Sequence, residues 1–167
     1  MELLKAENGR SWNQSSDILL AVARNLAQKG HPLWTENQLS QEGLQSAYRL
    51  DELHFLVQAN DVVGVTFLQQ SDKLFWPEIK TRDSMFLHKF AIHPAYSGQR
   101  LGQQAIILIK NEAINRGCSW LRLDCDNRQP LHTFYKGCGF KFVDLRQVAD
   151  FRVARYEMPL CESAKVL

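Results

Sequence analysis

The sequence has no long run of apolar residues and no block of basic residues. Its longest apolar run, Ala105 to Ile109, is far too short to span a membrane, and the N-terminal segment lacks the basic and apolar regions of a signal peptide. The formal net charge is only +2. A charge this small, without a cluster of lysines or arginines, argues against a nucleic-acid partner. We therefore expect neither a membrane segment nor a nucleic-acid-binding surface.

Paired cysteines and metal-binding histidine patterns are also missing. The histidines show no H-E-x-x-H or similar spacing, and Cys118, Cys125, Cys138 and Cys161 form no C-x-x-C pair. Structural disulfides are therefore not expected, and the reducing cytoplasm is the expected location. Asp124-Cys125-Asp126 contains a D-x-D pattern, but a metal site would need further ligands, so we expect no metal ion.

The composition fits one globular domain. The chain has 167 residues, 45% apolar and 23% charged, which is enough to bury a core in a single domain spanning residues 1–167. Apolar periodicity and turn residues predict a strand–helix–strand unit flanked by antiparallel strand pairs. The expected fold class is α/β (α+β), with a mixed, mostly antiparallel central sheet and helices on both faces. Strands are expected at residues 1–6, 54–59, 62–70, 84–93, 118–126, 140–145 and 151–160, and helices at about residues 15–30, 36–48, 101–116 and 131–137.

Several residues indicate local backbone geometry. Ser15 or Ser16 can cap the first helix, and Thr35 can cap the second. Gly117 is a natural end for the helix that precedes it. Gly64 lies inside a predicted strand, which suggests a bulge or the close approach of another backbone segment.

The stretch from Phe90 to Gln104 carries the strongest functional signal. An apolar strand runs into Pro94, a loop with glycines follows, and a long amphipathic helix begins. Such a turn presents backbone N–H groups at the positive end of a helix dipole, where phosphate can bind. Taken alone, it is equally compatible with an ordinary strand-to-helix turn. A P-loop is not expected, because Gly102 is followed by two glutamines and not by Lys-[Ser/Thr].

Two motifs resemble those of the GNAT superfamily of N-acetyltransferases. Ser97-Gly98-Gln99-Arg100-Leu101-Gly102 resembles the loop Gln/Arg-x-x-Gly-x-Gly/Ala that binds the acyl-CoA pyrophosphate, and Phe134-Tyr135-Lys136-Gly137-Cys138-Gly139-Phe140 resembles F/L-Y-x-x-x-G-F. Ser97 stands where Arg or Gln is usual, and Arg100 where Gly is usual. A positive φ at position 100 would strain an arginine; otherwise its guanidinium can add a phosphate contact. The predicted element order matches the family throughout.

The resemblance implies an acyltransferase that moves an acetyl group from acetyl-CoA to a primary amine of a small molecule or peptide, by direct attack in a ternary complex. Dimers are common in the family, so a homodimer is compatible with the resemblance. The alternative is a non-catalytic module that binds acyl-CoA; the departures at Ser97 and Arg100 favour it. The implied cofactor contacts are Phe90, Ala91, Ile92, Ser97, Gly98, Gln99, Arg100, Leu101, Gly102, Gln103, Asn127, Phe134 and Tyr135.

Tyr135 and His88 are the implied catalytic residues. A phenol, with a reference pKa of about 10, can protonate the departing thiolate; the alternative for Tyr135 is a half-buried core aromatic. His88 lies on the strand where relatives often place the base, and imidazole suits neutral pH. A packed strand histidine is the alternative, and His93 or a water relay are the next candidates for the base. Trp34 and Trp76, together with His88, are candidates for the acceptor pocket, or else the tryptophans anchor loops to the core.

Overall fold

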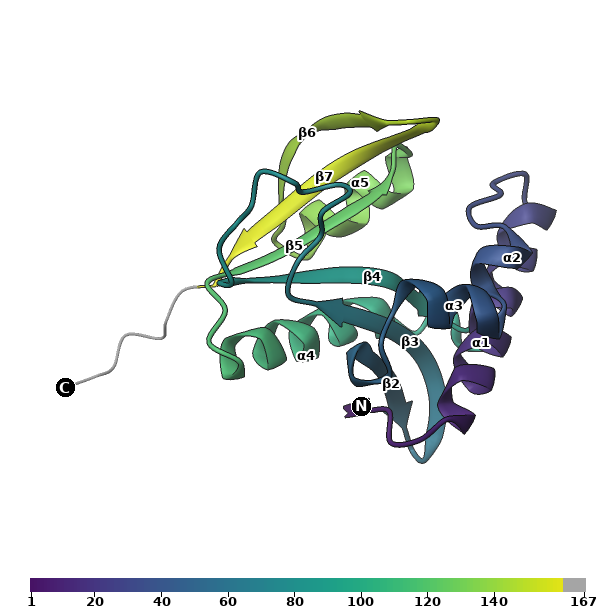
Figure 1. Ribbon diagram of the computed structural model, residues 1–167. Helices are drawn as coiled ribbons and strands as arrows, with labels where there is room; N and C mark the ends of the chain where they lie inside the picture. Colours follow the sequence, from purple (N-terminus) through teal and green to yellow (C-terminus); the bar gives the residue numbers. More distant parts are fainter. Residues whose placement is uncertain (161–167) are drawn as a thin grey trace. The chain divides into compact units, whose positions relative to one another are not determined.

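The computed structural model describes residues 1–160 (Figure 1). Strands and helices follow one another in the predicted order, with two short 3₁₀ turns, η1 (Leu50–Glu52) and η2 (Pro94–Tyr96). The strands are β1 (Glu2–Lys5), β2 (Leu53–Gln58), β3 (Asp61–Gln69), β4 (Ser84–Ile92), β5 (Trp120–Asp126), β6 (Lys141–Val148) and β7 (Phe151–Pro159). The helices are α1 (Arg10–Gln28), α2 (Glu36–Leu39), α3 (Gln41–Ala47), α4 (Leu101–Asn115) and α5 (Gln129–Gly137).

The strands form a seven-stranded sheet in the order β1-β2-β3-β4-β5-β7-β6. β4 and β5 pair in parallel, whereas β1 with β2, β2 with β3, β5 with β7 and β6 with β7 pair antiparallel. The prediction of a mixed, mostly antiparallel sheet in an α+β fold is thus confirmed. No helix within the described part of the chain has the length and apolar character that crossing a membrane requires.

The chain divides into two compact units, and β4 contributes to both. The first unit contains residues 1–68 and 89–105, and the second contains residues 69–88 together with the chain from residue 106 onward. The expectation of a single domain stays a prediction. Of the cysteines, Cys118, Cys125 and Cys138 are free thiols, and Cys161 lies outside the described residues.

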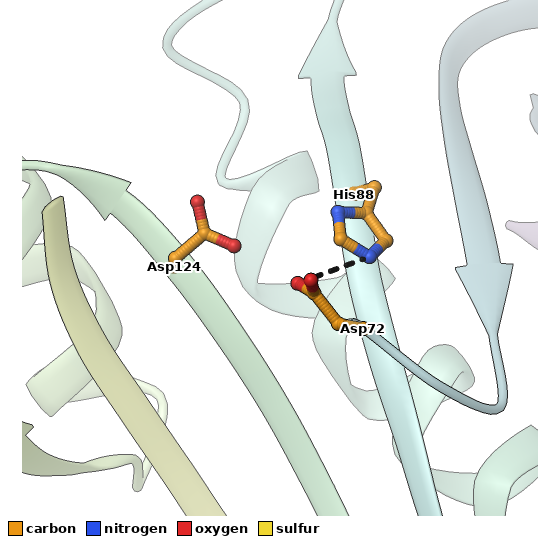
Figure 2. A group of neighbouring side chains, drawn as sticks. All are labelled: Asp72, His88 and Asp124. Carbon is orange, nitrogen blue, oxygen red and sulfur yellow. Dashed lines mark ion pairs between the residues drawn. The ribbon is translucent and has the colours of Figure 1, made fainter. Parts of the chain in front are cut away.

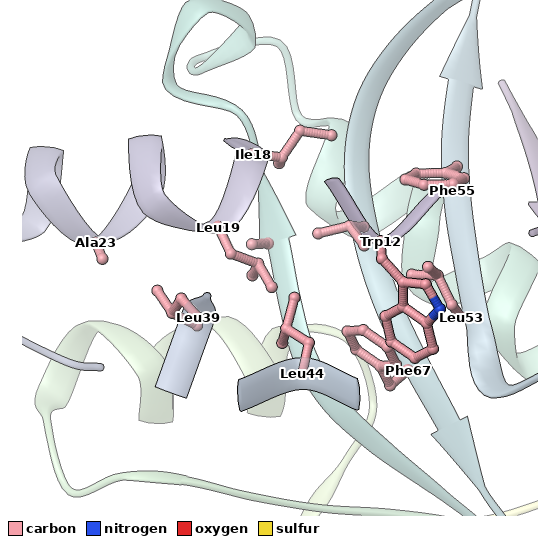
Figure 3. Close-up of a cluster of buried hydrophobic side chains, with 11 residues drawn as sticks. Trp12, Ile18, Leu19, Ala23, Leu39, Leu44, Leu53, Phe55 and Phe67 are labelled. Atoms are coloured by element: carbon pink, nitrogen blue, oxygen red, sulfur yellow. The ribbon is translucent and has the colours of Figure 1, made fainter. Parts of the chain in front are cut away.

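The core of the first unit lies between its helices and its hairpin (Figure 3). Leu19 of α1, Leu39 of α2 and Leu44 of α3 are fully buried against Leu53 of β2 and Phe67 of β3. Burying a leucine side chain stabilises the fold by roughly 1.5–3 kcal/mol. Packing against the strands therefore fixes α2 and α3, which are too short to be stable alone in water.

Helix α1 begins earlier than predicted. It starts at Arg10, so Ser15 and Ser16 lie inside the helix and are not its caps. Their hydroxyl groups are buried and satisfied elsewhere: Ser15 donates to the carbonyl of Trp12 at 2.8 Å, and Ser16 donates to the carbonyl of Leu39 at 2.6 Å. A serine that resembles a helix cap in the sequence can thus lie inside the helix and donate its hydroxyl to a backbone carbonyl of a neighbouring helix.

The second predicted helix is two helices that meet at Ser40. Thr35 caps α2 in a capping box with Gln38, as predicted. Ser40 is extended, with φ −60° and ψ 158°, and its side chain accepts the N–H of Gly43 at the start of α3. The break brings Gly43 close to Asn37, because a Cβ added at Gly43 would lie 2.0 Å from the Asn37 carbonyl oxygen.

β2 and β3 form the predicted hairpin, with a register shift after Leu56. The turn residues Ala59 and Asn60 have φ values of 50° and 70°, the left-handed geometry of tight hairpin turns. Gly64 of β3 lies against the backbone of β4: a Cβ there would come within 2.6 Å of the Ala91 carbonyl oxygen. The predicted close approach is therefore confirmed, and it fixes the end of β4.

Arg155 of β7 organises the packing of the second unit. Its side chain is only 5% exposed and donates to both carboxylate oxygens of Asp144 at 2.7 Å. The same guanidinium donates to the Phe75 carbonyl, contacts Glu78, and lies 4.4 Å from the centre of the Trp76 ring. These contacts tie the segment between β3 and β4 to the β6–β7 hairpin.

Candidate functional site

The candidate site begins where the β4–β5 pairing ends. The parallel register runs from Ser84 opposite Trp120 to Leu87 opposite Leu123. The next residues on the two strands are His88 and Asp124. Lys89 then has a φ of 48°, a left-handed conformation inside a strand and a mark of local distortion. His88 and Asp124 therefore occupy corresponding positions just beyond the last paired residues.

Asp72, from the segment between β3 and β4, completes the group. Its Oδ1 atom accepts the backbone N–H groups of Leu74 and Phe75 at 3.0 and 2.9 Å, which fixes the carboxylate at the start of a turn. Its Oδ2 atom lies 3.7 Å from Nε2 of His88. The side chain of Asp72 is 5% exposed and that of His88 15%, so this pair is largely shielded from water.

Figure 2 shows Asp72, His88 and Asp124 turned toward one another. One ligand atom from each lies within 4.8 Å of the corresponding atoms of the other two. All three belong to the second unit. The arrangement offers two carboxylates and one imidazole to a small cationic or hydrogen-bonding group. Sequence reasoning identified His88, set Asp124 aside as part of a D-x-D pattern, and missed Asp72.

Tyr135 of α5 is buried, with 8% of its surface exposed. Its ring makes edge contacts with Phe134 and Phe140, at centroid distances of 5.0 and 5.7 Å. Burial raises the pKa of Tyr135, and the nearby Cys125 and Asp124 raise it further. Tyr135 is thus held as a neutral phenol near Asp124. The structure places it deeper than a half-buried aromatic, and its catalytic role stays a prediction.

The predicted pyrophosphate loop is exposed and has two left-handed residues. Gly98 has a φ of 80° and Arg100 a φ of 56°, so the arginine adopts the strained conformation that the sequence left open. Helix α4 starts directly afterwards, at Leu101. The first N–H groups of a helix have no intrahelical partner, so those of Leu101, Gly102 and Gln103 are available to an anion.

The other histidine candidate is engaged in its own turn. The Nδ1 atom of His93 accepts the N–H of Ala95 at 3.1 Å and so caps η2. One ring nitrogen of His93 is therefore occupied by a structural hydrogen bond. The structure thus favours His88 over His93 as the histidine that faces other titratable groups.

The two tryptophans differ in their surroundings. Trp76 is 2% exposed, and the guanidinium groups of Arg122 and Arg155 lie over its ring at 5.6 and 4.4 Å. This environment favours the alternative that Trp76 anchors its loop to the core. Trp34 is partly buried, with the ammonium of Lys89 5.0 Å from its ring centre. Its part in an acceptor pocket stays a prediction.

Asn127 is held by a relay of hydrogen bonds. Its Oδ1 atom lies 2.7 Å from Nε2 of His132, and Nδ1 of His132 contacts the hydroxyl of Tyr156. Because Oδ1 can only accept, the neutral ring that satisfies both contacts carries its proton on Nε2 and accepts from the tyrosine at Nδ1. The amide N–H groups of Asn127 then face away from the histidine. Asn127 is exposed, which suits its predicted contact with the cofactor.

Comparison with known proteins gives a consistent result. The acetyltransferase (GNAT) family matches residues 20–140. The uncharacterized N-acetyltransferase YesJ of Bacillus subtilis (strain 168) is 23% identical over 133 residues, covering 75% of this chain and 74% of that protein.

The solved structures that share the fold include two acetyltransferases. A GNAT-family acetyltransferase from Listeria monocytogenes 4b F2365 superposes with a TM-score of 0.77 at 20% identity, covering 95% of this chain and 94% of that chain. The aminoglycoside acetyltransferase AAC(6')-Ib, solved with coenzyme A and kanamycin, superposes with a TM-score of 0.72 at 12% identity, with the same coverage.

Proposed function

Because the chain belongs to the GNAT acetyltransferase family, we propose that it transfers an acetyl group from acetyl-CoA to a primary amine of a small molecule or peptide, by direct attack in a ternary complex. The observation that carries this proposal is the placement of His88 with Asp72 and Asp124 just beyond the last paired residues of β4 and β5. Acetyltransfer to an amine needs a base at neutral pH, because an alkyl ammonium has a pKa of about 10.4 and cannot attack while protonated.

His88 is the proposed base. Its Nε2 atom faces the fixed Oδ2 atom of Asp72, so a proton taken up by the imidazole creates a positive charge 3.7 Å from a carboxylate. An opposite charge at this distance favours the protonated ring. Asp72 is accordingly a positioning residue, whose Oδ1 atom is held by two backbone N–H groups.

Tyr135 is the proposed acid. Its pKa is raised by burial, so the hydroxyl keeps its proton throughout the neutral and mildly alkaline range. A phenol held in this way can donate a proton to a thiolate as it departs. The aromatic contacts with Phe134 and Phe140 fix the ring, so the hydroxyl points in a defined direction.

The loop that precedes α4 fits the pyrophosphate of coenzyme A. The loop is exposed, Arg100 adds a positive charge, and the first-turn N–H groups of α4 have no intrahelical partner. Bound there, acetyl-CoA would supply an activated thioester. By resemblance, the backbone of Phe90 to Ile92 would pair with the pantetheine arm, and Asn127 and Phe134 would add contacts. Support for a small-molecule amine comes from AAC(6')-Ib, which was solved with kanamycin.

The proposal is tested by thiol release from acetyl-CoA with a panel of aliphatic amines. We expect turnover that falls at least a hundredfold in His88→Gln and in Tyr135→Phe, while His31→Gln, an exposed histidine before α2, keeps full activity. Calorimetry with acetyl-CoA should give micromolar binding to all four proteins. Binding without turnover would instead support the non-catalytic acyl-CoA-binding module. A cytoplasmic location and a homodimer stay predictions.

A further inference from the structure

We propose that Tyr156 and His132 orient the side-chain amide of Asn127, so that its NH₂ group faces outward as a hydrogen-bond donor to an acceptor oxygen of acetyl-CoA. The inference rests on the proposed function for the identity of this ligand. The orientation itself follows from three side chains that lie in one unit of the chain. Tyr156 and His132 are positioning residues, because they act through Asn127.

The orientation starts from the hydroxyl group of Tyr156. Tyr156 is fully buried on β7, whose neighbours in the sheet are β5 and β6. Its hydroxyl contacts Nδ1 of His132, which is its only hydrogen-bond partner among the described residues. A buried O–H group without an acceptor is costly, so the hydroxyl donates to Nδ1. Burial also raises the pKa of Tyr156, so the hydroxyl keeps the proton that it donates.

This hydroxyl fixes the tautomer of the His132 ring. With Nδ1 accepting, the proton of the neutral ring lies on Nε2, which is 2.7 Å from Oδ1 of Asn127. Aromatic contacts hold the ring in this direction, because its centre lies 6.0 Å from that of Phe142 and 5.7 Å from that of Tyr156. The other tautomer would turn a bare nitrogen toward Asn127 and leave the buried hydroxyl proton without an acceptor.

Asn127 receives the Nε2 proton of His132 at its oxygen. An amide carries its acceptor and its two N–H donors on separate branches, so an oxygen that faces the histidine turns the NH₂ group away from it. Asn127 is exposed, and its NH₂ group has no hydrogen-bond partner within residues 1–160. Two donors are therefore held in one orientation on the surface, where β5 ends and α5 begins.

The local fold does not use this amide. An asparagine beside a helix start commonly caps the helix by accepting a backbone N–H at its side-chain oxygen. Here Arg128 occupies the cap position of α5 without a side-chain capping bond, and Oδ1 of Asn127 bonds to His132 instead. The relay from Tyr156 thus neither ends β5 nor starts α5, and its result is a fixed donor open to a ligand.

A fixed donor suits the chemistry of acetyl-CoA. The cofactor has acceptor oxygens in the amide carbonyls of its pantetheine arm and in its phosphates. An amide free to turn would present its own oxygen to such an atom for part of the time, and two acceptors facing each other repel. Fixing the Asn127 amide before the ligand arrives removes that fraction and strengthens binding.

The tautomer can be measured without any ligand. ¹⁵N NMR of the His132 ring, assigned with His132→Gln, distinguishes a protonated nitrogen from a bare one. We expect the proton on Nε2 in the unaltered protein at pH 8, and we expect Tyr156→Phe to admit the other tautomer. A proton on Nδ1 in the unaltered protein, or an equal mixture of the two forms, would overturn the proposal.

Calorimetry with acetyl-CoA tests the outward NH₂ group. Asn127→Asp keeps an oxygen for His132 but has no N–H to offer, so we expect affinity to fall about tenfold, at least as far as in Asn127→Ala. Gln129→Leu is the matched control, because Gln129 is exposed in the first turn of α5 and donates to Thr133. Its affinity should change less than twofold. Unaltered binding by Asn127→Asp, or an equal loss in Gln129→Leu, would contradict the proposal.

A double-mutant cycle tests whether His132 acts through Asn127. We expect His132→Leu to weaken acetyl-CoA binding about fivefold, and His132→Gln, which keeps an N–H donor, to weaken it less. In the Asn127→Ala background, His132→Leu should have almost no further effect, because the amide that it orients is gone. Equal losses in both backgrounds would mean that His132 serves packing alone. Asn127 is exposed, so Asn127→Asp decides the question even if a His132 variant folds poorly.

Thiol release with amines is measured separately. The expected pattern of affinities without turnover would sink the proposed function and leave this inference standing. Turnover together with equal losses in both backgrounds of the cycle would do the reverse. Failure of the unaltered protein to bind acetyl-CoA would remove both.

Discussion

The Oδ2 atom of Asp72 lies 3.7 Å from Nε2 of His88, while its other oxygen is held by two backbone N–H groups. Asp72→Asn keeps an oxygen for those N–H groups but removes the negative charge beside the imidazole. Without that charge the protonated ring is less favoured, so the neutral base persists to lower pH. We expect the acidic limb of the kcat/KM profile to move to lower pH and its maximum to fall about tenfold or more.

A pH–rate series on the unaltered protein and on Asp72→Asn measures both effects. Asp83→Asn serves as a control, because Asp83 bonds Thr81 and Ser84 and lies outside the cluster. An unchanged acidic limb in Asp72→Asn would show that Asp72 does not act through His88.

Tyr135→Phe separates catalysis from folding. The substitution removes only the hydroxyl, and the ring contacts with Phe134 and Phe140 remain. We expect kcat to fall roughly 10²–10⁴-fold, the usual range for loss of a general acid, and acetyl-CoA affinity to change less than twofold. Single-turnover kinetics and calorimetry test the two parts, and equal turnover in both proteins would remove Tyr135 from the mechanism.

The buried phenol also predicts how stability depends on pH. Burial raises the pKa of Tyr135 above the value of about 10 that holds in the unfolded chain. Above pH 10 the unfolded chain therefore loses a proton that the folded protein keeps, and stability falls by up to about 1.4 kcal/mol per pH unit. Urea unfolding at pH 8 and pH 11 should show a larger loss in the unaltered protein than in Tyr135→Phe. Parallel losses would mean that the phenol ionises equally in both states.

The two left-handed residues of the pyrophosphate loop give opposite predictions. Arg100 has a φ of 56°, a conformation that glycine adopts without strain. Arg100→Gly should therefore raise the free energy of unfolding by about 1 kcal/mol. Gly98→Ala, at φ 80°, should lower it by about 1–2 kcal/mol, although a Cβ there meets nothing within 4 Å. Thermal unfolding measures both.

Coenzyme A binding tests the side chain of Arg100 separately. If its guanidinium contacts phosphate, Arg100→Gly should weaken acetyl-CoA binding about tenfold while stabilising the protein. Calorimetry with acetyl-CoA and 3′-dephospho-CoA identifies which phosphate is involved. Tighter binding by Arg100→Gly would show that the arginine only obstructs the loop.

Gly64→Ala tests whether β3 sets the position of the end of β4. The new Cβ would lie 2.6 Å from the carbonyl oxygen of Ala91, so one backbone segment must move, at a cost of typically 1–3 kcal/mol. We also expect weaker acetyl-CoA binding, because Ala91 lies in the stretch proposed to pair with pantetheine. Gly137→Ala, where a Cβ meets nothing within 4 Å, is the control: alanine favours helix α5 over glycine, so this variant should lose neither stability nor acetyl-CoA affinity.

Local patterns explain what the sequence predicted well. Apolar periodicity, the Thr35 cap and the hairpin turn each depend on neighbouring residues, and each was confirmed. The cap predicted at Ser15 or Ser16 was wrong, and the single helix predicted over residues 36–48 is interrupted at Ser40, because the partners of a serine hydroxyl and the position of a helix break depend on packing. Asp72 lies sixteen positions from His88 in a loop without periodicity. The loop is held by the hydrogen bond from Arg155 to the Phe75 carbonyl, and this tertiary contact, which the sequence does not reveal, places the Asp72 carboxylate beside β4.

The alignment of two strands decides which chemical groups meet at this site. His88 and Asp124 correspond because Leu87 lies opposite Leu123, and a slip of β5 by one residue would turn the Asp124 side chain to the other face. That alignment depends on the length of the connection through Gly117, where φ is 76°. Insertion or deletion of a single codon in this turn would thus remove the carboxylate from its place without altering any residue of the site. We expect descendants of this gene to keep the length of this connection.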